Sequence, residues 1–377
     1  MAIDRLPTPC LLLDPVRMNR NVARMDAKLA ALGVAARPHL KTAKSIEIAR
    51  RMMRSPARAA TVSTLAEAEA FAGAGVRDIL YAVGIAPNKL ARVVELRRRG
   101  LDLSIILDSE AQSLAVADAC RTLSERIPVL IEIDADDHRA GVPPGDARLV
   151  AIGRILHDGG AELRGVMTHA GGSYDTPGAD AIAAMAERER AGVVASANAL
   201  RAAGLPCPIV SVGSTPTATF ARDLTGVTEA RVGVYVFMDL VMAGLGVCAV
   251  DDIAISVLAT VIGHQRTKGW ILVDAGWMAL SRDRGTASQA VDCGYGLVCD
   301  VEGRPYADLV VHSANQEHGI IAVREGSGAT LPELSVGSLV RILPNHACAT
   351  AAQHSAYHVL REDGRDVIER WSRIGGW

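Results

Sequence analysis

The sequence lacks the features that mark membrane, secreted and nucleic-acid-binding proteins. No apolar segment of the kind found in secretory signals follows the first residues, and no later apolar run is long enough to span a bilayer. Neither charge predominates among the 377 residues, since 40 basic residues are balanced by 42 acidic ones. A nucleic acid or an anionic membrane surface is therefore not indicated as a partner. These absences predict a soluble, cytoplasmic protein.

Paired cysteines, repeats and low-complexity tracts are also absent. The seven cysteines are scattered and none forms a CxxC motif, so neither a disulfide framework nor a zinc ribbon is indicated. We expect most of them to be small buried residues in a reducing compartment, with Cys348 as the exception. The length of the chain predicts one large domain and a smaller one.

From about residue 34 to 237, short β-like runs alternate with amphipathic helical segments. Eight such units predict a (β/α)8 TIM barrel, which we assign to residues 14–243. A doubly wound open sheet is the competing architecture, but no GxGxxG motif follows the first strand. The predicted strands are 34–40, 60–64, 78–83, 103–108, 129–135, 163–170, 209–213 and 229–237. The predicted helices are 45–54, 65–74, 88–99, 109–124, 145–157 and 179–203.

The pattern changes after about residue 244. Strand-like runs are now separated by Gly, Asp and Asn turns with little helix between them, which predicts a mostly antiparallel β domain. We assign residues 244–377 to this domain together with residues 1–13, because the strand predicted at 8–13 can pair with it. The other predicted strands of the β domain are 253–266, 269–274, 308–312, 319–323 and 338–343.

Unusual polar residues fall where the predicted barrel strands end. Lys41 ends the first strand, Arg139 follows the fifth and His169 ends the sixth. The stretch 213–217 follows the seventh strand, and Tyr235 lies within the eighth. Catalytic residues of such barrels gather at this face. A lysine there can lose hydration and act as an amine nucleophile, although an ordinary lysine after a strand is simply solvated.

The turn at the end of the seventh strand suits a phosphate. Gly213, Ser214 and Thr215 precede a helix and offer backbone N–H groups and hydroxyls, although the same residues also make an ordinary helix N-cap. Together with Lys41 they predict pyridoxal 5′-phosphate, a phosphorylated carbonyl cofactor bound through a Schiff base. Arg139 can supply the group at the ring nitrogen, or else pair with a neighbouring aspartate at the surface.

His346 and Cys348 could hold a metal ion. In an extended segment, side chains two residues apart project from the same face. Imidazole and thiolate together suit Zn²⁺ and leave coordination positions for water or substrate. The alternative is a buried cysteine beside an incidental histidine, and His318 and His354 have the same ambiguity.

Four short motifs carry a family resemblance. They are Arg37-Pro38-His39-Leu40-Lys41-Thr42, the Gly213-Ser214-Thr215 turn, Gln316-Glu317-His318-Gly319 and Pro344-Asn345-His346-Ala347-Cys348. Together they resemble the D-serine dehydratase and D-threonine aldolase family. Its members are fold-type III pyridoxal phosphate enzymes with a barrel like that of alanine racemase, and the resemblance covers essentially the whole chain.

The resemblance implies a role for each of the candidate residues. Lys41 would form the Schiff base with the cofactor, and Arg139 would approach the pyridine nitrogen. His346 and Cys348 would bind a divalent metal, Zn²⁺, Mn²⁺ or Co²⁺, near the substrate hydroxyl. The remaining cofactor site would comprise His169, Tyr174 and Tyr235 around the ring, with Gly213, Ser214 and Thr215 at the phosphate.

The implied activity is that of a lyase which removes water from a D-3-hydroxy amino acid, of the D-threo-3-hydroxyaspartate or D-serine type. The products would be a 2-oxo acid and ammonia, with Lys41 as the base and the metal activating the β-hydroxyl. The aldolases of the family, which release glycine and an aldehyde, commonly carry HxD where this chain has His346-x-Cys348. That difference favours dehydration. A racemase remains an alternative, because tyrosines are available as a second base: Tyr295, Tyr306 and Tyr357.

Two further expectations concern the substrate and the assembly. A second carboxylate on the substrate would need a cation, for which Arg282 and Arg284 are candidates, although both could belong to a solvated charged turn. Relatives of this architecture place the β domain of one subunit near the barrel of another, so we expect a homodimer. A cofactor-binding protein without turnover is disfavoured, since such proteins are single barrels.

Overall fold

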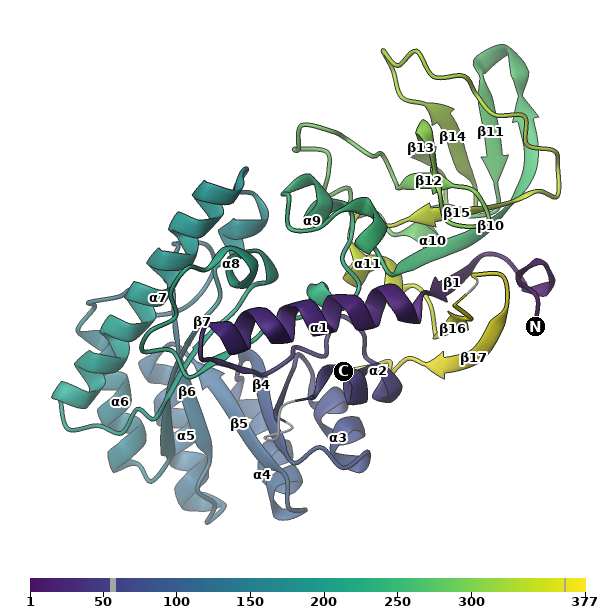
Figure 1. The fold of residues 1–377 in the computed structure, drawn as a ribbon. Coiled ribbons are helices and arrows are strands. Elements are labelled where there is room, and N and C mark those ends of the chain that lie inside the picture. The colour runs from purple at the N-terminus through teal and green to yellow at the C-terminus, as the bar shows by residue number, and fades with distance from the viewer. Residues whose placement is uncertain (55–58, 363) are drawn as a thin grey trace. The chain divides into compact units, whose positions relative to one another are not determined.

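The computed structural model describes residues 1–54, 59–362 and 364–377, which form two compact units (Figure 1). The barrel unit comprises Arg24–Gly233 and Ile374–Trp377, and the β unit comprises Met1–Ala23 and Val234–Arg373. The domain limits assigned from the sequence, 14–243 for the barrel, stay a prediction. Among the described helices, none is both long and apolar enough to cross a membrane.

The barrel unit contains all eight predicted strands. They are β2 (Ala35–Ala36), β3 (Ala59–Val62), β4 (Asp78–Gly84), β5 (Asp102–Leu107), β6 (Pro128–Ile133), β7 (Glu162–Thr168), β8 (Ile209–Val212) and β9 (Glu229–Ala230). They form one parallel sheet in the order β2-β9-β8-β7-β6-β5-β4-β3. The sheet closes where the N–H of Leu40 donates to the carbonyl of Thr61 over 2.8 Å. The predicted (β/α)8 fold is confirmed.

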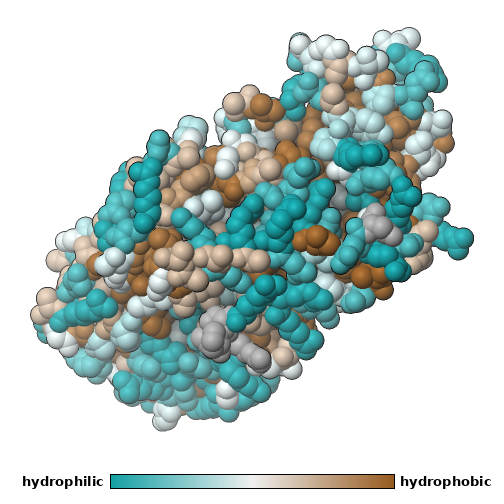
Figure 2. All heavy atoms as spheres, viewed as in Figure 1, coloured by the Kyte–Doolittle hydropathy of each residue, from teal (hydrophilic) through white to brown (hydrophobic). Residues whose placement is uncertain are grey.

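Helices alternate with these strands. They are α2 (Ile46–Met52), α3 (Leu65–Gly73), α4 (Leu90–Arg98), α5 (Glu110–Thr122), α6 (Arg148–Asp158), α7 (Ala179–Ala202) and α8 (Thr215–Phe220). Their apolar sides are buried, whereas Figure 2 shows mainly hydrophilic residues over α4 and α5. Local capping fixes several helix starts. The Thr64 hydroxyl accepts the N–H of Glu67, for example, while the Glu67 carboxylate accepts the N–H of Ser63. Helix α1 (Pro15–Ala31) was not predicted.

The first barrel strand explains the position of Lys41. Strand β2 covers only Ala35–Ala36, yet backbone hydrogen bonds to the neighbouring strands continue as far as Leu40. Pro38 interrupts the ladder because it has no N–H to donate. Lys41 is therefore the first residue beyond the hydrogen-bonded wall of the barrel, and its side chain is exposed.

The eighth strand ends earlier than predicted, and this corrects the placement of Tyr235. Gly233 lies so close to β2 that a Cβ there would be 3.1 Å from the carbonyl oxygen of His39. The 3₁₀ helix η4 (Val234–Val236) follows directly. Tyr235 therefore lies in η4 and not in the strand, so the expectation that it lies in the eighth strand was wrong. The β-branched residues of this run favour a strand, but their context determines the conformation.

The β unit is built from β1 (Cys10–Leu13), β10 (Ile255–Gln265), β11 (Trp270–Val273), β12 (Leu297–Cys299), β13 (Pro305–Ala314), β14 (Gly319–Val323), β15 (Leu339–Leu343), β16 (Ala356–Leu360) and β17 (Val367–Ser372). The strand order is β11-β14-β13-β12-β15-β10-β1-β16-β17, and β10 also pairs with β11, which closes the first six strands into an antiparallel barrel. As predicted, the N-terminal strand β1 pairs with this sheet, antiparallel to β10. Strands β12, β16 and β17 were not predicted. The helices of this unit are α9 (Leu240–Gly244), α10 (Trp277–Leu280) and α11 (Ala347–Ala352).

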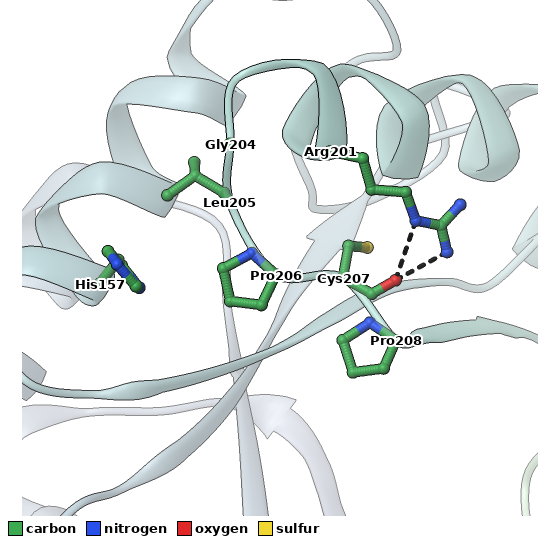
Figure 3. Close-up of a pocket in the computed structure, with 7 residues that line it drawn as sticks. All are labelled: His157, Arg201, Gly204, Leu205, Pro206, Cys207 and Pro208. Atoms are coloured by element: carbon green, nitrogen blue, oxygen red, sulfur yellow. Dashed lines mark hydrogen bonds between the residues drawn. The ribbon is translucent and has the colours of Figure 1, made fainter.

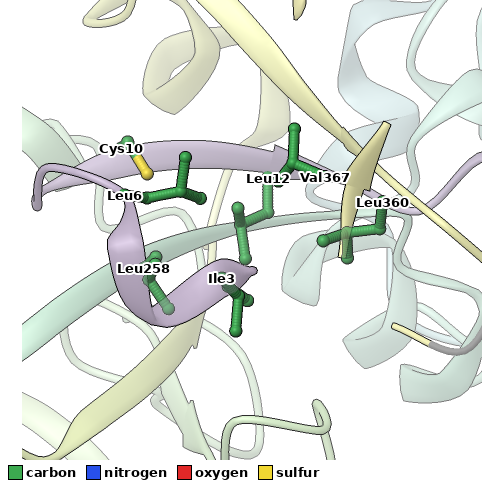
Figure 4. Close-up of a cluster of buried hydrophobic side chains, with 7 residues drawn as sticks. All are labelled: Ile3, Leu6, Cys10, Leu12, Leu258, Leu360 and Val367. Atoms are coloured by element: carbon green, nitrogen blue, oxygen red, sulfur yellow. The ribbon is translucent and has the colours of Figure 1, made fainter. Parts of the chain in front are cut away.

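The core of the β unit joins residues that are far apart in the sequence. Side chains from the N-terminal segment pack against β10, β16 and β17 in one apolar cluster (Figure 4). Burial of such side chains from water is the main force that holds the N-terminal strand in this unit. The cluster consists of Ile3, Leu6, Cys10, Leu12, Leu258, Leu360 and Val367.

Candidate active site

Basic side chains gather where the first and sixth strands of the barrel end. Lys41 is exposed, and its positive charge acts on two neighbouring histidines, His39 and His169. Burial is the main reason why the pKa of His169 is lowered to about 3, and the charges of Lys41 and Arg139 lower it further. Burial, together with Lys41 and other cations, also holds the pKa of His39 well below its usual range. Both imidazoles are therefore neutral at pH 7.

The orientation of the His169 ring is fixed from two sides. Its Nδ1 bonds to the carbonyl oxygen of Gly213, and because a carbonyl can only accept, Nδ1 carries the proton. The ring of Tyr174, in the 3₁₀ helix η3 (Gly171–Tyr174), lies 6.2 Å away between centroids at an angle of 47°. The structure thus places His169, Tyr174 and the Gly213 turn beside one another, while their role in a cofactor pocket stays a prediction.

The turn at the end of β8 is tightly packed. A Cβ on Gly213 would be 2.1 Å from the carbonyl oxygen of Arg231, so only glycine fits. The Ser214 hydroxyl accepts the N–H of Thr217 over 3.1 Å and also lies 2.9 Å from the hydroxyl of Ser173. The ordinary N-cap that the sequence left open is therefore present at Ser214.

A buried glutamate that the sequence analysis missed holds this turn in place. Glu189, on α7, accepts the N–H of Gly213 over 3.1 Å and the hydroxyl of Thr217 over 2.7 Å. It also accepts the N–H of Ala170 over 3.2 Å, so one carboxylate connects the ends of β7 and β8. Burial raises its pKa, and the three hydrogen bonds oppose that rise. Its sequence context, Ala-Glu-Arg-Glu-Arg, is typical of a solvated helix face and does not indicate that Glu189 is buried.

Replacing Glu189 by alanine is expected to lower the free energy of unfolding by about 3 kcal/mol or more, because three buried donors lose their acceptor. Urea unfolding measures this change. The matched control is Glu187→Ala on the same helix, where the carboxylate is half exposed and pairs with Arg190. This control substitution is expected to lower the free energy of unfolding by less than about 0.5 kcal/mol. Equal losses in the two variants would contradict the clamping role.

Arg139 and Arg231 follow the ends of two barrel strands, β6 and β9, and lie in different environments. Arg139 is exposed, and its guanidinium lies 3.5 Å from the carboxylate of Glu132. Among the described residues its ion-pair partner is therefore this glutamate and not a neighbouring aspartate. Arg231 is buried and donates to the carbonyl of Thr168 and the hydroxyl of Ser211. The sequence analysis missed Arg231, although it directly follows the eighth strand, as Lys41 follows the first.

The predicted metal pair lies in the β unit, but in a different backbone conformation from the one expected. His346 is extended (φ −129°, ψ 110°) and caps α11, whereas Cys348 is the second residue of that helix. The premise of an extended segment was therefore wrong, because the chain enters a helix directly after His346. The two side chains nevertheless interact, since Cys348 raises the pKa of the His346 imidazole.

Asp283 orients the imidazole of His346. Its carboxylate oxygen Oδ2 is 2.6 Å from Nδ1, which leaves Nε2 as the other ring nitrogen. Burial lowers the pKa of His346, but Asp283 and Cys348 together raise it to about 11. A carboxylate on the second ring nitrogen is the usual support of a metal-binding histidine. Within residues 1–54, 59–362 and 364–377, no cluster of three or more His, Cys, Asp or Glu side chains is arranged to hold a metal.

The two other candidate histidines, His318 and His354, lie in local contacts that do not involve the predicted metal pair. His318 belongs to the turn between β13 and β14, where its carbonyl accepts the N–H of Asn315 over 2.8 Å. The ring of His354 bonds to the carbonyl of Ala279 in α10 over 3.0 Å. Neither ring contacts the His346 pair in any of the described hydrogen bonds.

A surface hollow lies at the opposite end of the barrel strands, before β8 (Figure 3). The Arg201 side chain lies at one side of it and donates to the carbonyl of Cys207 over 3.2 and 2.7 Å. Burial raises the pKa of the Cys207 thiol to about 11, so this thiol is protonated and unreactive at pH 7. Prolines and Leu205 supply much of the remaining lining, and we assign no chemistry to this hollow.

Comparison with known proteins identifies the family. Residues 13–241 match the model "Alanine racemase, N-terminal domain", and residues 254–360 match "Putative serine dehydratase domain". The chain is 56% identical over 375 residues to D-threo-3-hydroxyaspartate dehydratase of Delftia sp. (strain HT23), covering 99% of this chain and 98% of that protein. It is 31% identical to D-serine dehydratase of Dictyostelium discoideum, over 97% of this chain and 96% of that protein. The chain belongs to the D-serine dehydratase and D-threonine aldolase family.

Other family members and solved structures agree with this assignment. D-threonine aldolase of Arthrobacter sp. is 30% identical over 96% of this chain and 90% of that protein. The structure of the Delftia dehydratase superposes with a TM-score of 0.96 at 55% identity, covering both chains completely. Two variants of that enzyme carry alanine in place of a histidine and of a cysteine two positions later, and the cysteine variant is in a metal-free form. Alanine racemase of Clostridium difficile 630, at 12% identity and a TM-score of 0.68, shares the fold.

Proposed function

We propose that this chain is a lyase that removes water from D-threo-3-hydroxyaspartate and related D-3-hydroxy amino acids, giving a 2-oxo acid and ammonia. The observation that carries this proposal is the His346–Cys348 pair, in a chain 56% identical over almost its whole length to a dehydratase of that substrate. A metal-free variant of that dehydratase lacks a cysteine with the same spacing from a histidine. The D-threonine aldolase relative is more distant, at 30% identity.

The strand ends of the barrel suit pyridoxal 5′-phosphate. An exposed primary amine, Lys41, is surrounded by neutral imidazoles and by guanidinium groups, a set that attracts a phosphorylated aldehyde. Lys41 would bind the aldehyde carbon, and when bound the cofactor supplies a sink for the electron pair of the substrate α-carbon. The other residues proposed to hold it are Arg139, His169, Tyr174 and Tyr235 around the ring, and Gly213, Ser214 and Thr215 at the phosphate.

Lys41 is also proposed as the base that takes the α-proton at its Nζ. Among the described residues, no carboxylate lies within ion-pair distance of Lys41, so no salt bridge holds its amine away from the substrate. His169 cannot compete as an acid, because its pKa is lowered to about 3 and its Nδ1–H is bonded to Gly213. Lys41 is therefore proposed to transfer the proton, and the imidazole of His169 to position the cofactor.

His346 and Cys348 are proposed to hold a divalent metal, Zn²⁺, Mn²⁺ or Co²⁺. Their imidazole and thiolate match the donors these ions prefer, and Asp283 holds the ring so that Nε2 is available. Two protein ligands leave positions for water and for the substrate. The metal supplies Lewis acidity, which makes the β-hydroxyl a better leaving group. Because His346 and Cys348 would have to lose their protons to bind the metal, metal affinity should fall with decreasing pH.

The alternatives have less support. Cleavage to glycine and an aldehyde needs a base at the β-hydroxyl, and this chain has a cysteine where the family's aldolases commonly have an aspartate. A racemase needs a second base, but burial raises the pKa of two of the three candidate tyrosines, Tyr306 and the fully buried Tyr357. We also propose a homodimer, because relatives of this architecture place the β domain of one subunit near the barrel of another. A cytoplasmic location is proposed as well, since the described cysteines form no disulfide.

Ammonia release tests the proposed function. The purified protein, supplied with pyridoxal phosphate and one divalent metal at a time, is incubated with D-threo-3-hydroxyaspartate, D-serine, D-threonine and their L-enantiomers. We expect ammonia from D-3-hydroxy amino acids, with the fastest release from D-threo-3-hydroxyaspartate, and none from the L-enantiomers. Release from none of the D-substrates would overturn the proposal.

A further inference from the structure

Arg282 lies in the β unit, in the loop after α10. Its guanidinium carbon is 4.3 Å from the centre of the Trp277 ring, a cation–π contact that stabilises the cation. Among the described residues, no carboxylate lies within ion-pair distance of Arg282. No residue in the described part of the chain accepts a hydrogen bond from the Arg282 guanidinium, so its N–H groups are able to donate to an anion.

The second arginine of the loop is already neutralised. Arg284 forms an ion pair with Asp292, and its guanidinium also lies 5.6 Å from the ring centre of Tyr295. From the sequence alone, Arg282 and Arg284 were equal candidates to bind a second substrate carboxylate. The structure favours Arg282, since its charge has no counter-ion among the described residues.

The support beneath Arg282 is firmly anchored. Helix α10 begins by donating two backbone N–H groups to the turn before β14, from Trp277 to Asn315 over 2.9 Å and from Met278 to Gln316 over 3.1 Å. A Cβ on Gly276 would be 2.3 Å from the carbonyl oxygen of Gln316, so the turn and the helix start touch. This contact gives the Gln316-Glu317-His318-Gly319 motif a structural role, which is to fix Trp277.

The same helix is tied to the proposed metal pair. Thr350 of α11 donates its hydroxyl to the carbonyl of Leu280 in α10 over 2.8 Å. Asp283, the neighbour of Arg282 in the chain, has its carboxylate 2.6 Å from His346. Arg282 thus belongs to a loop whose next residue contacts a proposed metal ligand.

The chemistry of the substrate requires a cation at this place. In 3-hydroxyaspartate, the carbon that carries the hydroxyl also carries the second carboxylate. If the hydroxyl binds the metal held by His346 and Cys348, that carboxylate must lie close to the same metal. A cation that recognises this carboxylate should therefore lie near the pair, and Arg282 directly precedes Asp283, whose carboxylate contacts His346.

We propose that Arg282, stacked on Trp277, binds the second carboxylate of the substrate and makes the enzyme selective for dicarboxylic D-3-hydroxy amino acids over D-serine. This inference rests on the proposed function. A guanidinium can engage a carboxylate through two parallel N–H donors, which a lysine cannot reproduce. D-serine has no second carboxylate and gains nothing from this contact.

The test compares kcat and KM for D-threo-3-hydroxyaspartate and D-serine in the metal-loaded holoenzyme and in three variants. For Arg282→Ala we expect KM for the dicarboxylic substrate to rise about 10- to 100-fold, the value of a charge-assisted hydrogen-bonded pair, with little change in kcat. For D-serine, kcat/KM should change no more than about twofold. Arg282→Lys should recover only part of the loss. Arg284→Ala, which removes the same charge from the same loop, should leave both substrates unaffected.

Three results would overturn the inference. If Arg282→Ala lowers kcat/KM equally for both substrates, the residue has a structural role. If KM for the dicarboxylic substrate is unchanged, another cation binds the second carboxylate. A loss in Arg284→Ala as large as in Arg282→Ala would show a general effect of charge. Failure of the unaltered enzyme to release ammonia from either substrate is a different outcome, because it overturns the proposed function itself.

Discussion

Replacement of Lys41 by alanine is expected to lower kcat for D-threo-3-hydroxyaspartate by about 10³-fold or more, because one side chain provides both the covalent attachment and the base. Lys41 is the first residue beyond the closed wall of the barrel, and it lies beside two neutral imidazoles. An absorbance band at ~420 nm in the unaltered enzyme, typical of a lysine-bound pyridoxal cofactor, should disappear in the variant. Steady-state kinetics and absorption spectra measure the two effects independently.

Lys41→Arg is the matched control for charge. Arginine keeps the positive charge beside His39 and His169 but cannot form the Schiff base, so we expect it to lose the band and the activity as completely as alanine does. Recovery of activity in Lys41→Arg would mean that only the charge is needed. Persistence of the band in Lys41→Ala would assign the attachment to a different lysine.

Removal of the metal is expected to have the second-largest effect. Chelation with EDTA should reduce kcat by about 10²- to 10⁴-fold, because the β-hydroxyl then leaves without a Lewis acid. Adding back a divalent metal should restore activity in the unaltered enzyme. In Cys348→Ala it should not, because the imidazole of His346 alone retains too little affinity. Activity assays together with metal analysis of the gel-filtered protein measure both effects.

The control for this experiment is Cys248→Ala, which makes the same change at another partly buried cysteine of the β unit. It should retain bound metal and full activity. An EDTA-treated enzyme that keeps full activity while metal analysis shows none bound would remove His346 and Cys348 from catalysis. Equal metal loss in Cys248→Ala and Cys348→Ala would point to general destabilisation.

The sequence predicted the barrel well because each strand and helix has its own local pattern. All eight strands were predicted, and so were most of the polar residues at the strand ends, with Arg231 as the exception. That reasoning works because parallel strands of a closed barrel present their C-terminal ends at one face. The resemblance of the short motifs was confirmed by two family models and by full-length relatives.

Contacts between distant segments could not be predicted. Glu189 looks like a solvated residue in a charged helix, and only the fold shows that it binds the ends of β7 and β8. Asp283 contacts His346 across 63 residues of sequence, a distance that no local pattern spans. Tyr235 was misplaced because strand propensity depends on the packing around a residue, and the 3₁₀ helix η4 begins directly after Gly233.

The choice between elimination and carbon–carbon cleavage is the central claim, and one reaction followed by proton NMR tests it most directly. The holoenzyme is incubated with D-threo-3-hydroxyaspartate, and the products are identified without coupling enzymes while ammonia is measured in parallel. The account predicts oxaloacetate and ammonia in equal amounts, with no glycine. Glycine and glyoxylate in equal amounts, without ammonia, would contradict it and make this chain an aldolase.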